Sequence, residues 1–162
     1  MAIEQVKAYL AQYHMADAVR ELEQSSATVA LAAQALGCEE ARIAKTLSFY
    51  AKEGTARLVV AAGDQKIDGA KYKQTFGEKP KMLKAEGVEA MVGHSPGGVC
   101  PFAVKDGVKV YLDQSLQRFT TVFPACGSSN SAIEMTMAQL EQCAQTTAWV
   151  DVCKAKEPIV QE

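Results

Sequence analysis

The sequence contains no apolar run near the roughly 18 residues that a membrane-spanning helix requires. Its first seven residues carry an acid, Glu4, and an amphipathic rhythm. A secretory signal peptide has instead a basic end followed by an apolar block. These absences predict a soluble, cytoplasmic protein without a membrane partner.

Histidine is scarce, because His14 and His94 are the only two. This argues against a histidine-based metal centre. The cysteines are odd in number, widely spaced and without a Cys-x-x-Cys pair, which fits neither a disulfide framework nor a zinc site. We predict reduced, mostly buried thiols and no metal or other cofactor; the cysteines are Cys38, Cys100, Cys126, Cys143 and Cys153.

A strong excess of charge is also missing. The net charge of −2 argues against strong nucleic-acid binding by bulk electrostatics. The distribution is uneven: residues 1–40 have a net charge of −4 and residues 64–84 one of +3. The basic stretch is either a surface for a polyanion or a solvated helix face.

What is present suits a globular protein: 162 residues, 48% hydrophobic and 22% charged, with no repeat or linker. We predict one domain over residues 1–162, of α/β (α+β) class, with a mixed sheet or barrel flanked by helices. We expect helices over residues 3–14, 26–36 (N-cap Ser25 or Ser26, stopped by Gly37), 68–76, 84–92 and 136–143 (capping box Thr136 to Gln139), with a helical turn over 39–44. We expect strands over residues 19–23, 45–50, 57–61, 108–112, 120–123, 131–135 and 148–152, with a poorly ordered tail from 154 to 162.

Three segments are candidates for chemistry. Lys45 is predicted to open a strand, where it either binds an anion or is an exposed strand end. Residues 93–102 (GHSPGGVCPF) suit neither a helix nor a central strand, so they form either a tight connection or a shaped loop whose backbone N–H groups approach a ligand. Residues 127–130 (GSSN) form either a hairpin turn or an anion-binding nest.

Together, these segments resemble the YbaK/EbsC family of aminoacyl-tRNA editing hydrolases, relatives of the editing domain inserted in bacterial prolyl-tRNA synthetases. The resemblance covers roughly residues 25–145. It is carried by residues 42–47 (RIAKTL), 62–68 (AGDQKID), 93–102 and 125–133 (ACGSSNSAI). Lys45 together with Gly97-x-x-x-Pro101 is its most specific part.

The resemblance implies a mixed barrel of six or seven strands and a trans-acting deacylase without a metal. Such an enzyme hydrolyses the ester between a wrong, small amino acid and the 3′-terminal ribose of a tRNA. The catalytic residues would be Lys45, Gly97, Gly98 and Pro101. Substrate-binding residues would be His94, Val99, Cys100, Phe102, Gly127 and Ser128, with Gly127 and Ser128 in the same pocket as the loop.

Two features depart from the expected pattern. Ala103 stands where many relatives have glycine, which would alter the shape of the pocket. The acidic balance leaves little grip on tRNA, since phosphate contacts dominate such affinity. We therefore expect weak tRNA binding through residues 66–84, or help from an aminoacyl-tRNA synthetase.

Two other functions stay open. One is a non-catalytic module of the same fold that binds an aminoacyl or nucleotide group. The other is a thiol-dependent hydrolase that uses Cys100 or Cys126.

Overall fold

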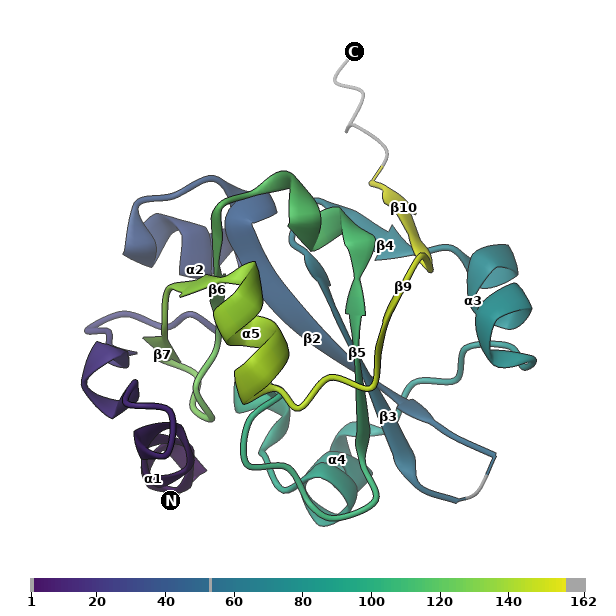
Figure 1. Cartoon of the computed structure of the whole chain (residues 1–162), viewed down its shortest axis with the longest axis horizontal. Helices are drawn as coiled ribbons and strands as arrows, with labels where there is room; N and C mark the ends of the chain where they lie inside the picture. Colours follow the sequence, from purple (N-terminus) through teal and green to yellow (C-terminus); the bar gives the residue numbers. More distant parts are fainter. Residues whose placement is uncertain (1, 53, 157–162) are drawn as a thin grey trace.

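A computed structural model describes residues 2–52 and 54–156 of the chain (Figure 1). A curled, six-stranded mixed sheet forms its centre, in the order β8-β6-β2-β3-β5-β9. β2 pairs antiparallel with β3 and β6 with β8, whereas β2–β6, β3–β5 and β5–β9 are parallel. The strands are β2 (Ile43–Tyr50), β3 (Ala56–Ala62), β5 (Lys109–Asp113), β6 (Thr121–Pro124), β8 (Met135–Thr136) and β9 (Ala148–Val150). The prediction of a mixed, barrel-like sheet flanked by helices is confirmed, with the sheet curled into a half-barrel.

The two faces of the sheet carry different cores because side chains alternate along a strand. Leu58 and Val60 of β3 face the main core, whereas Val59 and Ala61 face a smaller outer cluster. Every residue of β3 is buried, in agreement with its apolar run over residues 58–62. In register, Lys45 lies opposite Ala61 and therefore belongs to the outer face.

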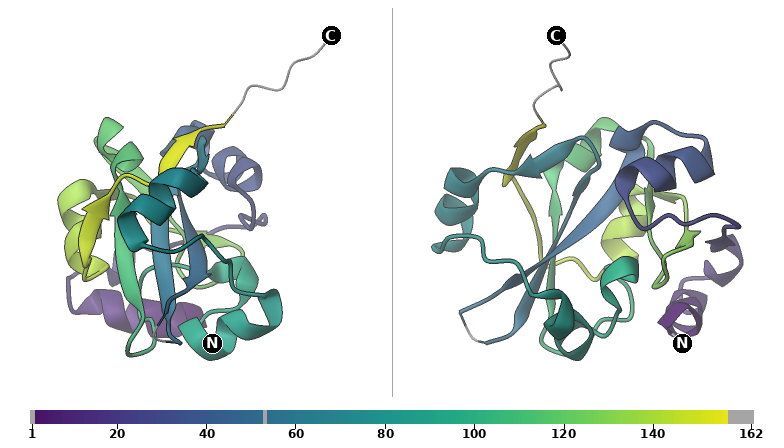
Figure 2. Two further views of the ribbon diagram at one scale, coloured as in Figure 1. Left: turned by 90° about the vertical axis from the view of Figure 1, so that its right-hand side faces the viewer. Right: turned by 180° about the vertical axis from the view of Figure 1, so that it is seen from behind.

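The helices cover both faces of the sheet (Figures 1 and 2). Side chains of α1, α4 and α5 enter the main core, that of Tyr72 on α3 enters the outer cluster, and α2 packs on Ile43 and Phe123. The helices are α1 (Ala2–Ala11), α2 (Val29–Leu36), α3 (Gly69–Phe76), α4 (Ala85–Val92) and α5 (Met137–Cys143), with short 3-10 turns η1 (Ala16–Ala18), η2 (Glu40–Arg42), η3 (Pro96–Gly98) and η4 (Gln114–Arg118). No helix in the described part of the chain is long and apolar enough to cross a membrane.

Several predicted boundaries are wrong. The helical turn near residue 40 ends at Arg42, and β2 starts two residues before Lys45 because Ile43 and Ala44 pair with β6. The N-cap of α2 is Thr28, whose Oγ1 accepts from the Leu31 N–H at 3.2 Å, and not Ser25 or Ser26. The capping box of α5 forms as predicted.

The expected strand over residues 131–135 is divided into β7 (Ser131–Ala132) and β8, and β7 pairs with the two-residue β1 (Arg20–Glu21). Thus the short strand expected over 19–23 exists but is shorter. The β1–β7 pair joins segments more than 100 residues apart, whereas β8 pairs with the nearby β6, and local patterns do not show this division of partners.

A two-stranded ribbon was not predicted. It consists of β4 (Gln65–Ile67) and β10 (Cys153–Ala155), which pair antiparallel. The expected disorder is therefore wrong for Lys154 and Ala155, and the rest of that prediction from residue 157 onward lies outside the described residues. Each strand has three residues, too few for an alternating pattern to be recognised.

Candidate functional site

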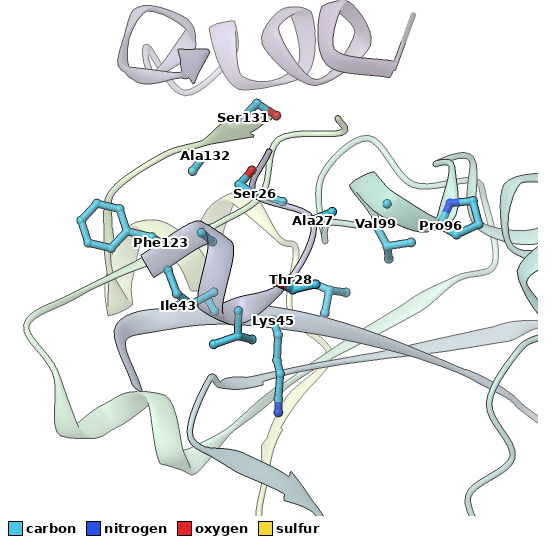
Figure 3. A pocket seen from close by; sticks show the side chains of 16 residues that line it. Ser26, Ala27, Thr28, Ile43, Lys45, Pro96, Val99, Phe123, Ser131 and Ala132 are labelled. Carbon is cyan, nitrogen blue, oxygen red and sulfur yellow. The ribbon is translucent and has the colours of Figure 1, made fainter. Parts of the chain in front are cut away.

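A small pocket of about 120 Å³ lies where β2 begins and β6 ends. The N-terminal end of α2 and the loop of residues 93–102 close it on two other sides (Figure 3). The lining is mainly small and apolar, and its residues are Ser26, Ala27, Thr28, Val29, Ala32, Ile43, Ala44, Lys45, Thr46, Pro96, Gly97, Val99, Phe123, Ala125, Ser131 and Ala132. Of this set, Lys45, Gly97 and Val99 have a site role predicted from the sequence.

The loop is shaped by close backbone packing. Residues 96–98 form the short 3-10 turn η3, which is closed by the Gly98 N–H donating to the Ser95 carbonyl at 2.9 Å. A Cβ on Gly98 would lie 2.6 Å from the backbone carbon of Gly127. Only glycine fits there, so the turn of residues 127–130 fixes the position of η3.

Gly127 and Ser128 do not line the pocket. They line a neighbouring hollow together with Gly93 and Ser95. The structure thus places these two residues beside the pocket rather than in its lining, because the two loops pack against each other through Gly98. The Ser128 hydroxyl donates to Ser131 Oγ at 2.7 Å, so this turn is linked to a pocket residue.

His94, Cys100 and Phe102 belong to the loop, but their side chains are fully buried and do not line the pocket. His94 Nε2 lies 2.7 Å from the Phe102 carbonyl oxygen and 3.5 Å from Cys100 Sγ. Burial lowers the pKa of His94, which favours the neutral ring with Nε2–H as the donor. The structure places these residues where they support the loop from within.

Pro101 and Ala103 also lie away from the pocket, beside a small hollow that Tyr9 lines. Ala103 has a φ of +53°, a conformation that favours glycine. This left-handed backbone explains why glycine suits the position. Alanine in place of glycine at position 103 therefore affects backbone strain more directly than pocket shape.

Lys45 connects the pocket to the β4–β10 ribbon. Its side chain extends away from Phe123, Val99 and the other labelled residues (Figure 3), and Nζ donates to the Gln65 carbonyl of β4. Burial, followed by the nearby charge of Lys156, lowers the pKa of Lys45 to about 8. One of its three N–H donors is used, so two stay available for a ligand.

Thr46 supplies a hydroxyl that sequence reasoning missed. Its Oγ1 is buried without a hydrogen-bond partner among the described residues. The other lining hydroxyls are occupied, for example that of Thr28 by the α2 cap and that of Ser26 by the Ser129 carbonyl at 3.3 Å. The only available signal was its position next to Lys45 in the RIAKTL segment.

Phe123 forms one wall and is held by two arginines. The guanidinium carbons of Arg42 and Arg20 lie 5.0 Å and 5.7 Å from its ring centroid. Both arginines pair with Glu134, at 3.2 Å and 3.5 Å. The two arginines and Glu134 thus hold Phe123 in place without lining the pocket themselves. These residues are too far apart in the sequence for the arrangement to be recognised from it.

The thiols are free, and all but Cys38 are buried, as predicted. Burial raises the pKa of Cys100 to about 12 and also raises that of Cys126. Neither thiol lines the pocket. In the described ranges, no group of three or more His, Cys, Asp or Glu residues has the arrangement of a metal site.

The chain is thus a mixed α/β domain whose curled half-barrel bears a small pocket with a glycine-containing wall and a lysine in its lining. Residues 23–143 match the sequence model of the aminoacyl-tRNA editing domain. The chain therefore belongs to the aminoacyl-tRNA editing family that includes the YbaK/EbsC proteins.

Three relatives illustrate the match. The chain is 49% identical to "Uncharacterized protein YwhH" of Bacillus subtilis over 95% of its own length and 98% of the relative's. It is 30% identical to "Putative Cys-tRNA(Pro)/Cys-tRNA(Cys) deacylase EbsC" of Enterococcus faecalis, over 64% and 63% of the two chains. A crystal structure described as "a putative trans-editing enzyme for prolyl tRNA synthetase" superposes with a TM-score of 0.84 at 26% identity, covering 95% and 98% of the two chains.

Proposed function

We propose that this chain is a trans-acting deacylase that hydrolyses the ester of a misacylated tRNA carrying a small amino acid. The observation that carries the proposal is the small pocket of about 120 Å³ between η3 and β2, lined by small residues and by Lys45. An apolar cavity of about 150 Å³ holds benzene. A pocket of this size thus suits a side chain smaller than an aromatic ring, and the family match supplies the tRNA ester.

The backbone of the loop is suited to the chemistry of ester hydrolysis. The reaction passes through an oxyanion, which backbone N–H groups stabilise. The Val99 N–H makes no backbone hydrogen bond among the described residues, so it is available as a donor. An ester is already activated, and a positioned water is sufficient for its attack.

A thiol nucleophile fits the site poorly. Cys100 and Cys126 are buried, and their raised pKa values keep them protonated near neutral pH, whereas the thiolate is the reactive form. The non-catalytic binding module is the second candidate, since it needs the same pocket and the same lysine.

The decisive experiment is a panel of misacylated tRNAs incubated with the purified protein, with release of the amino acid as the readout. We expect fastest release for small amino acids such as alanine, serine or cysteine and slow release for aromatic ones. Folded protein that binds these tRNAs but releases nothing from any of them would establish the binding module instead.

Replacement of Thr46 by valine is expected to raise stability and lower activity together. A buried hydroxyl without a partner costs about 1–3 kcal/mol, so the isosteric valine should increase the free energy of unfolding by about 1 kcal/mol. If the hydroxyl bonds the aminoacyl group, kcat/KM for deacylation should fall about tenfold, the value of one neutral hydrogen bond.

The matched control is Thr146→Val. Thr146 Oγ1 is also buried and unpartnered among the described residues, but Thr146 does not line the pocket. The control should gain stability in denaturant unfolding and keep its deacylation rate. Equal rates for the two variants would remove Thr46 from substrate binding.

A further inference from the structure

The β4–β10 ribbon carries an unusual arrangement of like charges. Lys66 on β4 lies directly opposite Lys154 on β10. Lys156 follows, and its backbone N–H donates to the Asp64 carbonyl at 3.0 Å, which continues the pairing by one residue. Like charges directly opposite each other destabilise a strand pair, so the ribbon holds a charge pattern that an anion would relieve.

The acidic residues nearby are already engaged. Asp64 binds Arg118 through two hydrogen bonds of 2.6 and 3.0 Å, and Asp151 pairs with Lys71 at 3.1 Å. Asp68 accepts from two backbone N–H groups at the start of α3.

Within the described residues, Lys66, Lys154 and Lys156 make no ion pair within 4 Å. Lys154 and Lys156 are exposed, and Lys66 is half-buried. The ribbon therefore presents three positive charges without contacting counter-ions.

The ribbon is continuous with the pocket. Lys45 lines the pocket, and its Nζ donates to the Gln65 carbonyl on β4. A ligand whose acyl group occupies the pocket would thus pass Lys45 before it reaches Lys66, Lys154 and Lys156. β10 lies beyond residues 23–143 that match the family, so half of this surface comes from outside the matched region.

We propose that the β4–β10 ribbon binds the backbone phosphates of the single-stranded acceptor end of a tRNA whose terminal ester occupies the pocket. This inference rests on the proposed function. A row of cations beside an ester pocket complements the phosphates that precede the terminal ribose, because phosphate contacts to lysine position nucleic acids.

The ribbon also limits which lysines of the basic stretch over residues 66–84 belong to the proposed tRNA-binding surface. Its lysines are divided: Lys71 is neutralised by Asp151, and Lys81 lies 5.4 Å from the ring of Tyr50. Lys79 and Lys84 lie near the end of the sheet at which β3 and β5 begin, where Arg57 is the register partner of Lys109. This end is away from Lys45. Only Lys66 of this stretch belongs to the ribbon.

The test compares two triple variants with equal charge change. K66Q/K154Q/K156Q removes the ribbon charges, and K79Q/K84Q/K109Q removes three lysines at the far end of the sheet. Binding of tRNA without an attached amino acid is titrated at several salt concentrations. Thermal unfolding confirms that both variants fold. Deacylation is measured on aminoacyl-tRNA and on aminoacyl-adenosine, which lacks the phosphates.

We expect the ribbon variant to bind tRNA at least tenfold more weakly. Its plot of log affinity against log salt should be less steep by about 2, since each single-strand phosphate contact contributes about 0.7. These rates are measured near pH 6.5, where Lys45 is protonated with or without the charge of Lys156. The kcat/KM of the ribbon variant should fall on aminoacyl-tRNA and stay unchanged on aminoacyl-adenosine, and the control variant should match the wild type in every assay.

The outcomes separate the two proposals. If the wild type hydrolyses neither substrate but the ribbon variant alone loses tRNA binding, the proposed function fails and the ribbon is still an RNA-binding surface. Equal tRNA binding by both triple variants overturns the ribbon proposal, whatever the wild type hydrolyses. An equal loss on aminoacyl-adenosine overturns it too, because that substrate has no phosphates to bind.

Discussion

Lys45→Ala is expected to lower kcat/KM for deacylation about 10²–10³-fold, the usual effect of removing one donor to a developing charge. Lys45 lines the pocket, its ammonium extends toward the Gln65 carbonyl of β4 and uses one N–H donor there, and alanine removes the whole group without filling its place. The measurement is single-turnover release of the amino acid from misacylated tRNA. Lys109→Ala serves as the control because Lys109 is an exposed lysine at the far end of the sheet.

The pH dependence gives a second readout of the same group. The pKa of Lys45 is about 8, so the catalysed rate divided by the uncatalysed rate should fall above about pH 8 as the ammonium loses its proton. Lys45→Arg should abolish that fall, since arginine stays charged. A wild-type profile that rises through this range, or full activity in Lys45→Ala, would contradict the assignment.

Lys45→Met should also stabilise the fold. A lowered pKa means that the folded state disfavours the charged amine, and this penalty is fully present below about pH 8 and disappears as the pH approaches the unfolded value near 10.5. The gain in free energy of unfolding should therefore be largest at neutral pH and shrink in alkaline solution. Loss of activity with a gain in stability distinguishes a functional lysine from a structural one.

Gly98→Ala is expected to cost about 3 kcal/mol of stability, at the upper end for overpacking. The new Cβ would lie 2.6–2.7 Å from three backbone atoms of Gly127 and Ser128, none of which can rotate away. The loop must then move, and a displacement of about 1 Å at a catalytic wall costs about 10²-fold in rate. Denaturant unfolding and deacylation would measure the two effects.

Gly97→Ala is the steric control for stability. A Cβ at that position would lie 3.5 Å from Ser129 Cβ, an ordinary van der Waals contact. Its free energy of unfolding should change by less than about 1 kcal/mol. Equal destabilisation by the two variants would show that the backbone contact of Gly98 does not position the loop.

Local sequence determined much of the fold. The apolar run of β3, the capping box of α5 and the glycines that end α2, α3 and α4 act within a few residues of the element that they define. Such signals can be recognised without any knowledge of partners. The same holds for the Pro96–Gly98 segment, whose proline and glycines mark it as unusual, whereas the functional role of Lys45 comes from the family resemblance.

Only the tertiary structure decided how these parts meet. Ile43 joins β2 through its parallel partner on β6, and β4 exists only because β10 returns beside it. These contacts join segments about 80 residues apart, and their free energy comes from pairing and burial that local patterns do not record. The same long-range packing directs Lys45 toward Gln65, buries the His94 side chain and separates Ser128 from the pocket.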